Sequence, residues 1–217
     1  MSQLGADDWI LSTFKEPGFF LDVGCHDGQR LSNTYKLEKN GWKGICVDPF
    51  PTNFEDRPNS IVEKAVVYSE ADKEIEFTQV LDGDPGLSGI DENMGRHKDA
   101  VKNLKHNIVK LKTSLLCDIL DKHNAPNYID YFNIDIEGSE YEVLSTFDFN
   151  KYEFGALSIE HNYEEPKRTM IKDLLESKGY KRFKEVEWDD WYIRDSTQSW
   201  GGVILLVITI ILLIIFA

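Results

Sequence analysis

A strand-like apolar run that ends in a glycine turn is the feature of this sequence that most constrains its fold. Phe19 to Val23 have the length and composition of a buried strand, and Gly24 and Gly28 lie in the turn that follows. The glycine spacing is G-x-x-x-G, whereas dinucleotide-binding proteins carry G-x-G-x-x-G so that a pyrophosphate can approach the backbone. The turn is therefore typical of a Rossmann-like α/β protein whose ligand has no pyrophosphate, and it disfavours a nicotinamide-dependent oxidoreductase.

Short apolar runs alternate with amphipathic stretches along the rest of the chain, which favours an α/β domain with a largely parallel sheet. Further strands are predicted over residues 43–47, 61–68, 128–134 and 154–159. Helices are predicted over residues 29–39, 115–122, 140–147 and 167–178. A terminal antiparallel pair is expected over residues 180–186 and 191–194, around Asp189 and Asp190.

The stretch from 69 to 112 is less regular than its surroundings. Residues 74–80 and 108–113 alternate in polarity as strands do, and turn residues separate them. We interpret this stretch as an inserted antiparallel excursion that covers one end of the sheet. Three histidines in polar stretches are expected to be surface residues, namely His97, His106 and His123.

Composition narrows the class of partner. The chain has 217 residues, which suits one compact domain, and a formal net charge of −14. A surface this acidic repels phosphate backbones, so DNA and RNA are not expected as partners. Cys25, Cys46 and Cys117 form no C-x-x-C pair and adjoin apolar runs, so we expect reduced and mostly buried thiols.

Asp48 ends the second predicted strand, 26 residues after Asp22, which is the interval expected across one strand–helix–strand unit. S-adenosylmethionine has no phosphate and presents a carboxylate and an ammonium, a ribose diol and an adenine. A glycine turn lets the backbone pass close to its methionine portion, and an acidic residue after the second strand accepts bonds from the ribose hydroxyls. The predicted cofactor site contains Asp22, Gly24, Cys25, His26, Gly28, Asp48 and Asp135.

A second motif follows the predicted strand 128–134. It has the pattern Asp-x-Glu-Gly-x-Glu, formed by Asp135, Glu137, Gly138 and Glu140. Together with Ser158 to His161, Asp189 to Tyr192 and the first strand, this motif makes residues from about Phe19 to Arg194 resemble the FkbM methyltransferase family.

That resemblance implies a seven-stranded sheet with the last strand antiparallel, S-adenosylmethionine as cofactor, and transfer of a methyl group to a hydroxyl oxygen. The sequence departs from the family pattern in two respects. The family more often has Glu where Asp48 stands, and small residues around the positions of Cys25 and His26. His26 is therefore expected to crowd or gate the cofactor.

The expected chemistry is an in-line displacement in which a hydroxyl attacks the methyl group of a sulfonium, and such a hydroxyl needs a general base. Candidate catalytic residues follow the fourth and fifth strands, and they are Asp135, Glu137, Glu160 and His161. His161 has the most suitable intrinsic pKa for the base, and Asp135 is expected to orient the cofactor or the acceptor.

Structural roles are open for the same side chains. Asp135 suits a helix cap, Glu137 a helix dipole and His161 a hydrogen-bonded strand end. The four candidates could also ligate a divalent cation, but no spacing such as H-x-x-x-H indicates one, so we predict no metal site.

Residues 203–217 are apolar throughout apart from Thr209. With Gly201 and Gly202 they would form a helix about 26 Å long, slightly under a hydrocarbon core of about 30 Å. A soluble core helix or a buried strand is the alternative, but the segment has no polar face and exceeds normal strand length. We predict a methyltransferase domain over 1–194, a linker over 195–200 and a membrane anchor over 201–217, with the catalytic domain on the cytosolic side.

The acceptor is predicted to be a small-molecule, glycan or lipid-linked hydroxyl at a membrane surface. The alternative is a non-catalytic, membrane-tethered adaptor or trafficking protein with a methyltransferase-like fold. The intact glycine and acidic positions argue against that alternative, since a degenerate domain would be free to lose them. Oligomeric state is left open by the sequence.

Overall fold

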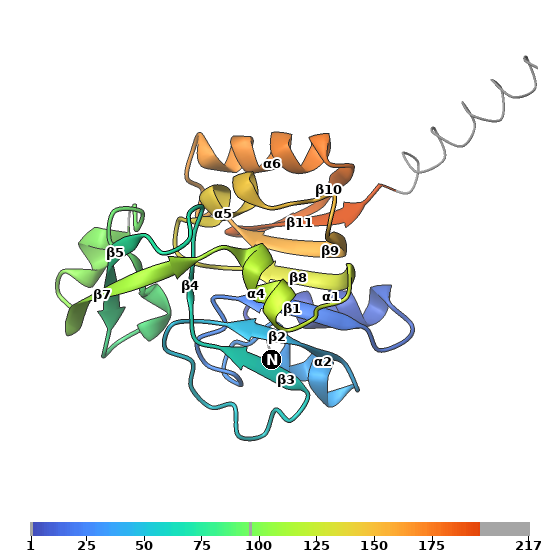
Figure 1. Ribbon diagram of the computed structural model, residues 1–217, viewed down its shortest axis with the longest axis horizontal. Helices are drawn as coiled ribbons and strands as arrows, with labels where there is room; N and C mark the ends of the chain where they lie inside the picture. The colour runs from blue at the N-terminus through green and yellow to red at the C-terminus, as the bar shows by residue number, and fades with distance from the viewer. Residues whose placement is uncertain (1, 96, 196–217) are drawn as a thin grey trace, which may run out of the picture.

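The computed structural model describes residues 2–95 and 97–195, and these build a seven-stranded mixed sheet (Figure 1). In spatial order its strands are β10 (Tyr180–Val186), β11 (Asp189–Arg194), β9 (Glu153–Glu160), β8 (Tyr128–Ile134), β1 (Phe19–Val23), β2 (Lys43–Val47) and β3 (Ser60–Glu63). β11 is antiparallel to both its neighbours, β9 and β10, while β9, β8, β1, β2 and β3 pair in parallel. The expected sheet, with the last strand of the chain antiparallel, is confirmed.

Helices cover both faces of this sheet, so its central strands are buried on both sides. One face packs against α4 (Leu116–Lys122), α5 (Glu140–Thr146) and α6 (Lys167–Ser177). The other packs against α1 (Ala6–Thr13) and α2 (Tyr35–Lys39). Continuous apolar runs rather than alternating ones follow from this double coverage, as in β9, where every residue after the first is buried.

The inserted region forms a second sheet beyond one end of the large one, on the left of Figure 1. Within the described residues it has four strands, in the order β4 (Val66–Val67), β7 (His106–Ser114), β5 (Glu74–Val80) and β6 (Gly89–Ile90). The 3-10 helix η1 (Pro85–Leu87) and the helix α3 (His97–Val101) complete the insertion. The predicted excursion is confirmed, although β4 joins it parallel to β7.

The single strand predicted over 61–68 is wrong, because the chain changes sheets within it. β3 is an edge strand of the large sheet, and Ile61 is 41% exposed there. Val66 and Val67 belong to the small sheet, where Val66 packs beside Phe77. Two separate cores therefore divide the segment, and the charged residues Glu63 and Lys64 lie where it leaves the large sheet.

The helix predicted over 29–39 begins late, at Tyr35. Side-chain hydrogen bonds hold the preceding residues in turns: the Asp27 carboxylate accepts from the backbone N–H groups of Gln29 at 2.9 Å and Arg30 at 2.8 Å. Such local bonds compete with helix formation. Asp189 and Asp190 do not form the predicted turn either, because they begin β11 while Glu187 and Trp188 make the turn.

No helix in the described ranges is long and apolar enough to cross a membrane. The predicted anchor over 201–217 lies outside the described residues, and so do residues 196–200 of the predicted linker.

Candidate functional site

A cavity of about 820 Å³ is lined by residues at the carboxyl ends of the central strands and by residues of the inserted sheet. Its wall contains the glycine turn after β1, the end of β2, the end of β8 and η1. Open α/β sheets bind ligands at this edge, and the volume lies in the range of a small-molecule site.

Gly24 is required by a backbone contact at the base of this cavity. Its φ is +86°, and a Cβ added there would lie 1.6 Å from the carbonyl oxygen of Asp135. The Asp135 N–H in turn donates to the Val23 carbonyl at 3.0 Å. The glycine therefore lets the end of β8 approach β1, which brings Asp135 to the cavity wall. Packing within the protein thus requires a glycine here, in addition to the expected approach of a cofactor.

Gly28 follows the residues of the glycine turn that line the cavity and is not itself among them. An added Cβ would be 2.8 Å from the Asn53 carbonyl oxygen, and the Gly28 N–H donates to the Thr52 carbonyl at 2.8 Å. The geometry gives Gly28 the role of holding the segment after β2 against the glycine turn, and its cofactor contact stays a prediction.

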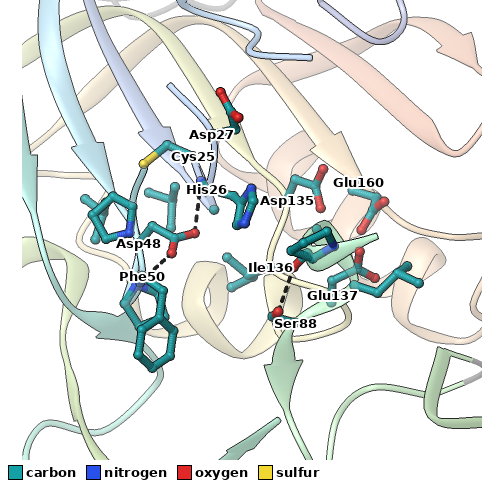
Figure 2. A pocket seen from close by; sticks show the side chains of 18 of the residues that line it. Cys25, His26, Asp27, Asp48, Phe50, Ser88, Asp135, Ile136, Glu137 and Glu160 are labelled. Carbon is teal, nitrogen blue, oxygen red and sulfur yellow. Dashed lines mark hydrogen bonds between the residues drawn. The ribbon is translucent and has the colours of Figure 1, made fainter. Parts of the chain in front are cut away.

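Asp48 joins the end of β2 to the same turn. Its carboxylate accepts from the backbone N–H of His26 at 3.0 Å and of Phe50 at 2.7 Å (Figure 2). Burial raises the pKa of Asp48, and the two N–H bonds oppose that rise. Each carboxylate oxygen can accept a further bond, so Asp48 remains able to bind hydroxyl groups in the cavity. Cys25 and His26 line the cavity beside it.

Asp22 reaches the cavity wall but is held within the protein. Its two oxygens accept from the Thr34 hydroxyl at 2.5 Å and from the Asn133 amide at 2.9 Å. Asn133 also accepts from Ser158 at 2.6 Å, so this buried network links β1, β8 and β9. Asn133 was missed by the sequence reasoning, although a lone amide in the apolar run 128–134 was a usable signal.

Three of the predicted catalytic residues come together. Asp135 and Glu137 follow β8, Glu160 ends β9, and one carboxylate oxygen of each lies within 4.8 Å of the others. All three line the cavity. In Figure 2 the His26 ring lies between the carboxylate of Asp48 and the carboxylate of Asp135. We call Asp135, Glu137 and Glu160 the carboxylate group.

Crowding of negative charge changes the protonation of this group. Burial raises the pKa of Asp135 to about 6, with repulsion from Asp22 and Asp48 adding to the effect. Burial and the charge of Asp135 raise the pKa of Glu160 well above its ordinary value. Bringing three carboxylates together thus favours a proton or a cation among them.

His97 was expected at the surface, and that expectation is wrong. It begins α3 in the insertion, its side chain is only 17% exposed, and its Nε2 lies 3.5 Å from a Glu137 carboxylate oxygen. The residue lines the cavity. Its polar sequence neighbourhood gave no sign of this, because the insertion folds back over the sheet.

His161, the predicted base, does not line the large cavity with Asp135 and Glu160. It lines a small pocket that Glu137 also lines, and its Nδ1 accepts from the Tyr163 N–H at 2.9 Å. Its Nε2 lies 3.6 Å from Asp190. Asp190 also accepts from Arg168 at 2.8 Å and Arg182 at 3.1 Å. Burial opposes ionisation of Asp190, but these cationic neighbours hold its pKa below the ordinary value.

The strand order, the antiparallel last strand and a cavity lined by a glycine turn and acidic strand ends are together what the sequence resemblance implied for a Rossmann-like methyltransferase. Residues 22–182 match the methyltransferase FkbM domain, and the chain belongs to this family. No curated protein and no solved structure matches the chain.

Proposed function

We propose that this protein transfers the methyl group of S-adenosylmethionine to a hydroxyl oxygen. The proposal depends on two observations taken together. The chain matches the FkbM domain, and Asp48 and the carboxylate group line the same cavity. Asp48 supplies carboxylate oxygens for the ribose hydroxyls, and the neighbouring Phe50 supplies an apolar surface for the adenine. The methionine portion then lies toward the glycine turn.

In the proposed reaction the acceptor oxygen attacks the methyl carbon in line with the carbon–sulfur bond. That bond breaks with its electron pair going to sulfur, which yields S-adenosylhomocysteine. The hydroxyl proton passes to the carboxylate group. Asp135 is the best acceptor for it, because a base with a pKa of about 6 is largely ionised near neutral pH yet still basic. His161 is disfavoured as the base, since its ring contacts Tyr163 and Asp190.

The acceptor is proposed to be a glycan, lipid-linked or small-molecule hydroxyl, which enters beside the inserted sheet. Val80, Leu87 and Ser88 of the insertion line that side of the cavity and offer a mixed apolar and polar wall. A glycan or lipid-linked acceptor agrees with a membrane location, which we propose from the apolar sequence 203–217 alone.

Three measurements test these proposals. Calorimetric titration of the full-length protein with S-adenosylmethionine should give one bound cofactor per chain, and methyl-labelled cofactor should mark a product in extracts separated into lipids, glycans and small molecules. Absence of cofactor binding would favour the non-catalytic adaptor.

For the membrane location, full-length protein should pellet with membranes and resist carbonate, whereas a chain ending at residue 200 should stay in the supernatant.

A further inference from the structure

Asp135 and Glu160 of the carboxylate group carry charge that no cationic side chain among the described residues offsets, while His97 lies 3.5 Å from the third member, Glu137. Neither Asp135 nor Glu160 forms an ion pair with a lysine, arginine or histidine in the part of the chain that the structure describes. Asp22, Asp48 and Asp84 add further negative charge around Asp135. A buried carboxylate without a partner is costly, because burial removes the water that would otherwise solvate its charge.

Glu160 provides a second, separate sign of a missing ligand. The residue is 7% exposed, and its Oε2 is buried without a hydrogen-bond partner among the described residues. Glu160 lines the cavity and lies beside Asp135 and Glu137 in Figure 2. Buried polar atoms are nearly always satisfied, so an orphaned oxygen aimed into an acidic group indicates that something else binds there.

Either a proton or a cation can satisfy this oxygen. A proton shared between Asp135 and Glu160 neutralises one charge and leaves Glu137 beside a second carboxylate. A divalent cation neutralises two charges at once. The spacing also suits a cation: metal–oxygen distances of about 2.0–2.6 Å place ligand oxygens up to about 4–5 Å apart, and here the three oxygens lie within 4.8 Å of one another.

We propose that Asp135, Glu137 and Glu160 bind one divalent cation that prefers oxygen ligands, of the Mg²⁺ or Mn²⁺ kind. Each residue contributes one carboxylate oxygen. The remaining coordination positions face the cavity and are open to water or to hydroxyl groups. If the proposed methyl transfer is correct, an acceptor with two adjacent hydroxyls fits these positions best.

Manganese alone is the probe for this site. Full-length protein kept in detergent micelles is titrated with Mn²⁺, and the electron paramagnetic resonance signal of free Mn²⁺ reports how much is bound. We expect one site per chain. Glu160→Gln and Asp135→Asn should each weaken it by at least about tenfold, as loss of a ligand or its support does. Calorimetry with S-adenosylmethionine on the same samples keeps a failure of the cofactor proposal separate from a failure of the cation site.

Glu153→Gln is the matched control, because Glu153 begins the same strand that Glu160 ends and pairs with Arg194 at 2.9 Å on the surface. It should bind Mn²⁺ as the unaltered protein does. Equal binding in all variants would mean adventitious ions on an acidic surface and would overturn the site. No binding at all would mean a shared proton, and displacement of Mn²⁺ by S-adenosylmethionine would mean that the cofactor's own positive groups occupy the position. Either result would also overturn it.

Discussion

The carbonyl oxygen of Asp135 lies so close to Gly24 that a Cβ on Gly24 would come within 1.6 Å of it. This contact is where the turn after β1 meets the end of β8. The contact sets the position of Asp135, and with it the carboxylate group, relative to the glycine turn. This position depends on the absence of a side chain at Gly24.

Gly24→Ala should therefore destabilise the whole domain rather than only block the cofactor. A left-handed φ costs an alanine about 1–2 kcal/mol, and overpacking adds about 1–3 kcal/mol. Gly5→Ala is the control, because Gly5 has φ +81° but nothing within 4 Å of its added Cβ. Urea denaturation should show a clearly larger loss of unfolding free energy for Gly24→Ala. Equal losses in the two variants would mean that the Asp135 contact relaxes without cost.

Asp48→Asn should weaken S-adenosylmethionine binding in a protein that still folds, at a cost of about 1–3 kcal/mol in stability, because one of two backbone N–H groups loses its acceptor. The amide is the same size but offers one acceptor oxygen in place of two, and the carboxylate already bonds to the N–H groups of His26 and Phe50. Losing a charge-assisted hydrogen bond of about 1.5–3 kcal/mol should raise the dissociation constant by about tenfold to 100-fold. Calorimetry measures this, and Asp56→Asn, an exposed change in the following loop, is the control. Unaltered affinity would remove Asp48 from the site.

His161→Ala should affect stability more than catalysis. Removing the ring leaves the Tyr163 N–H without its acceptor and takes one neighbour from Asp190, so we expect a loss of about 1–3 kcal/mol. A general base would cost about 100-fold or more in turnover, whereas a structural histidine should cost less than about tenfold at a temperature where the variant stays folded. A fall of 100-fold in kcat for folded protein, with an altered pH profile, would restore His161 as the base.

Asp190→Asn should remove a stabilising contribution that depends on pH. The carboxylate accepts from Arg168 and Arg182, and breaking a buried ion network costs about 3 kcal/mol. The folded-state pKa of Asp190 lies below 3.8, so its contribution is complete above that pH and is lost as the pH falls through the folded-state pKa. Urea denaturation should show a large difference from the unaltered protein near neutral pH and a smaller one in strong acid. A difference that is constant with pH would contradict this.

The local sequence was sufficient to predict a strand wherever all residues of the segment belong to one sheet. The predicted strands over 43–47 and 128–134 coincide with β2 and β8, because each is bounded by turn residues and buried on both faces. The run 61–68 failed for the opposite reason, since two cores compete for it. The roles of Glu137 and Glu140 were equally beyond the sequence. Glu140 accepts from the N–H groups of Ile136 and Gly138 and so holds the turn, while Glu137 lines the cavity.

By itself the sequence determined the family, the glycine turn and the acidic strand ends, because apolar runs, glycine spacing and short motifs are properties of neighbouring residues. Only the tertiary structure decided which of those acidic and basic groups meet. Glu160 and His161 are adjacent in the chain, yet Glu160 joins the cavity while His161 packs beside Asp190. Successive side chains at a strand end point to opposite sides. The sequence contains that alternation, but long-range packing alone determines which side faces the cavity.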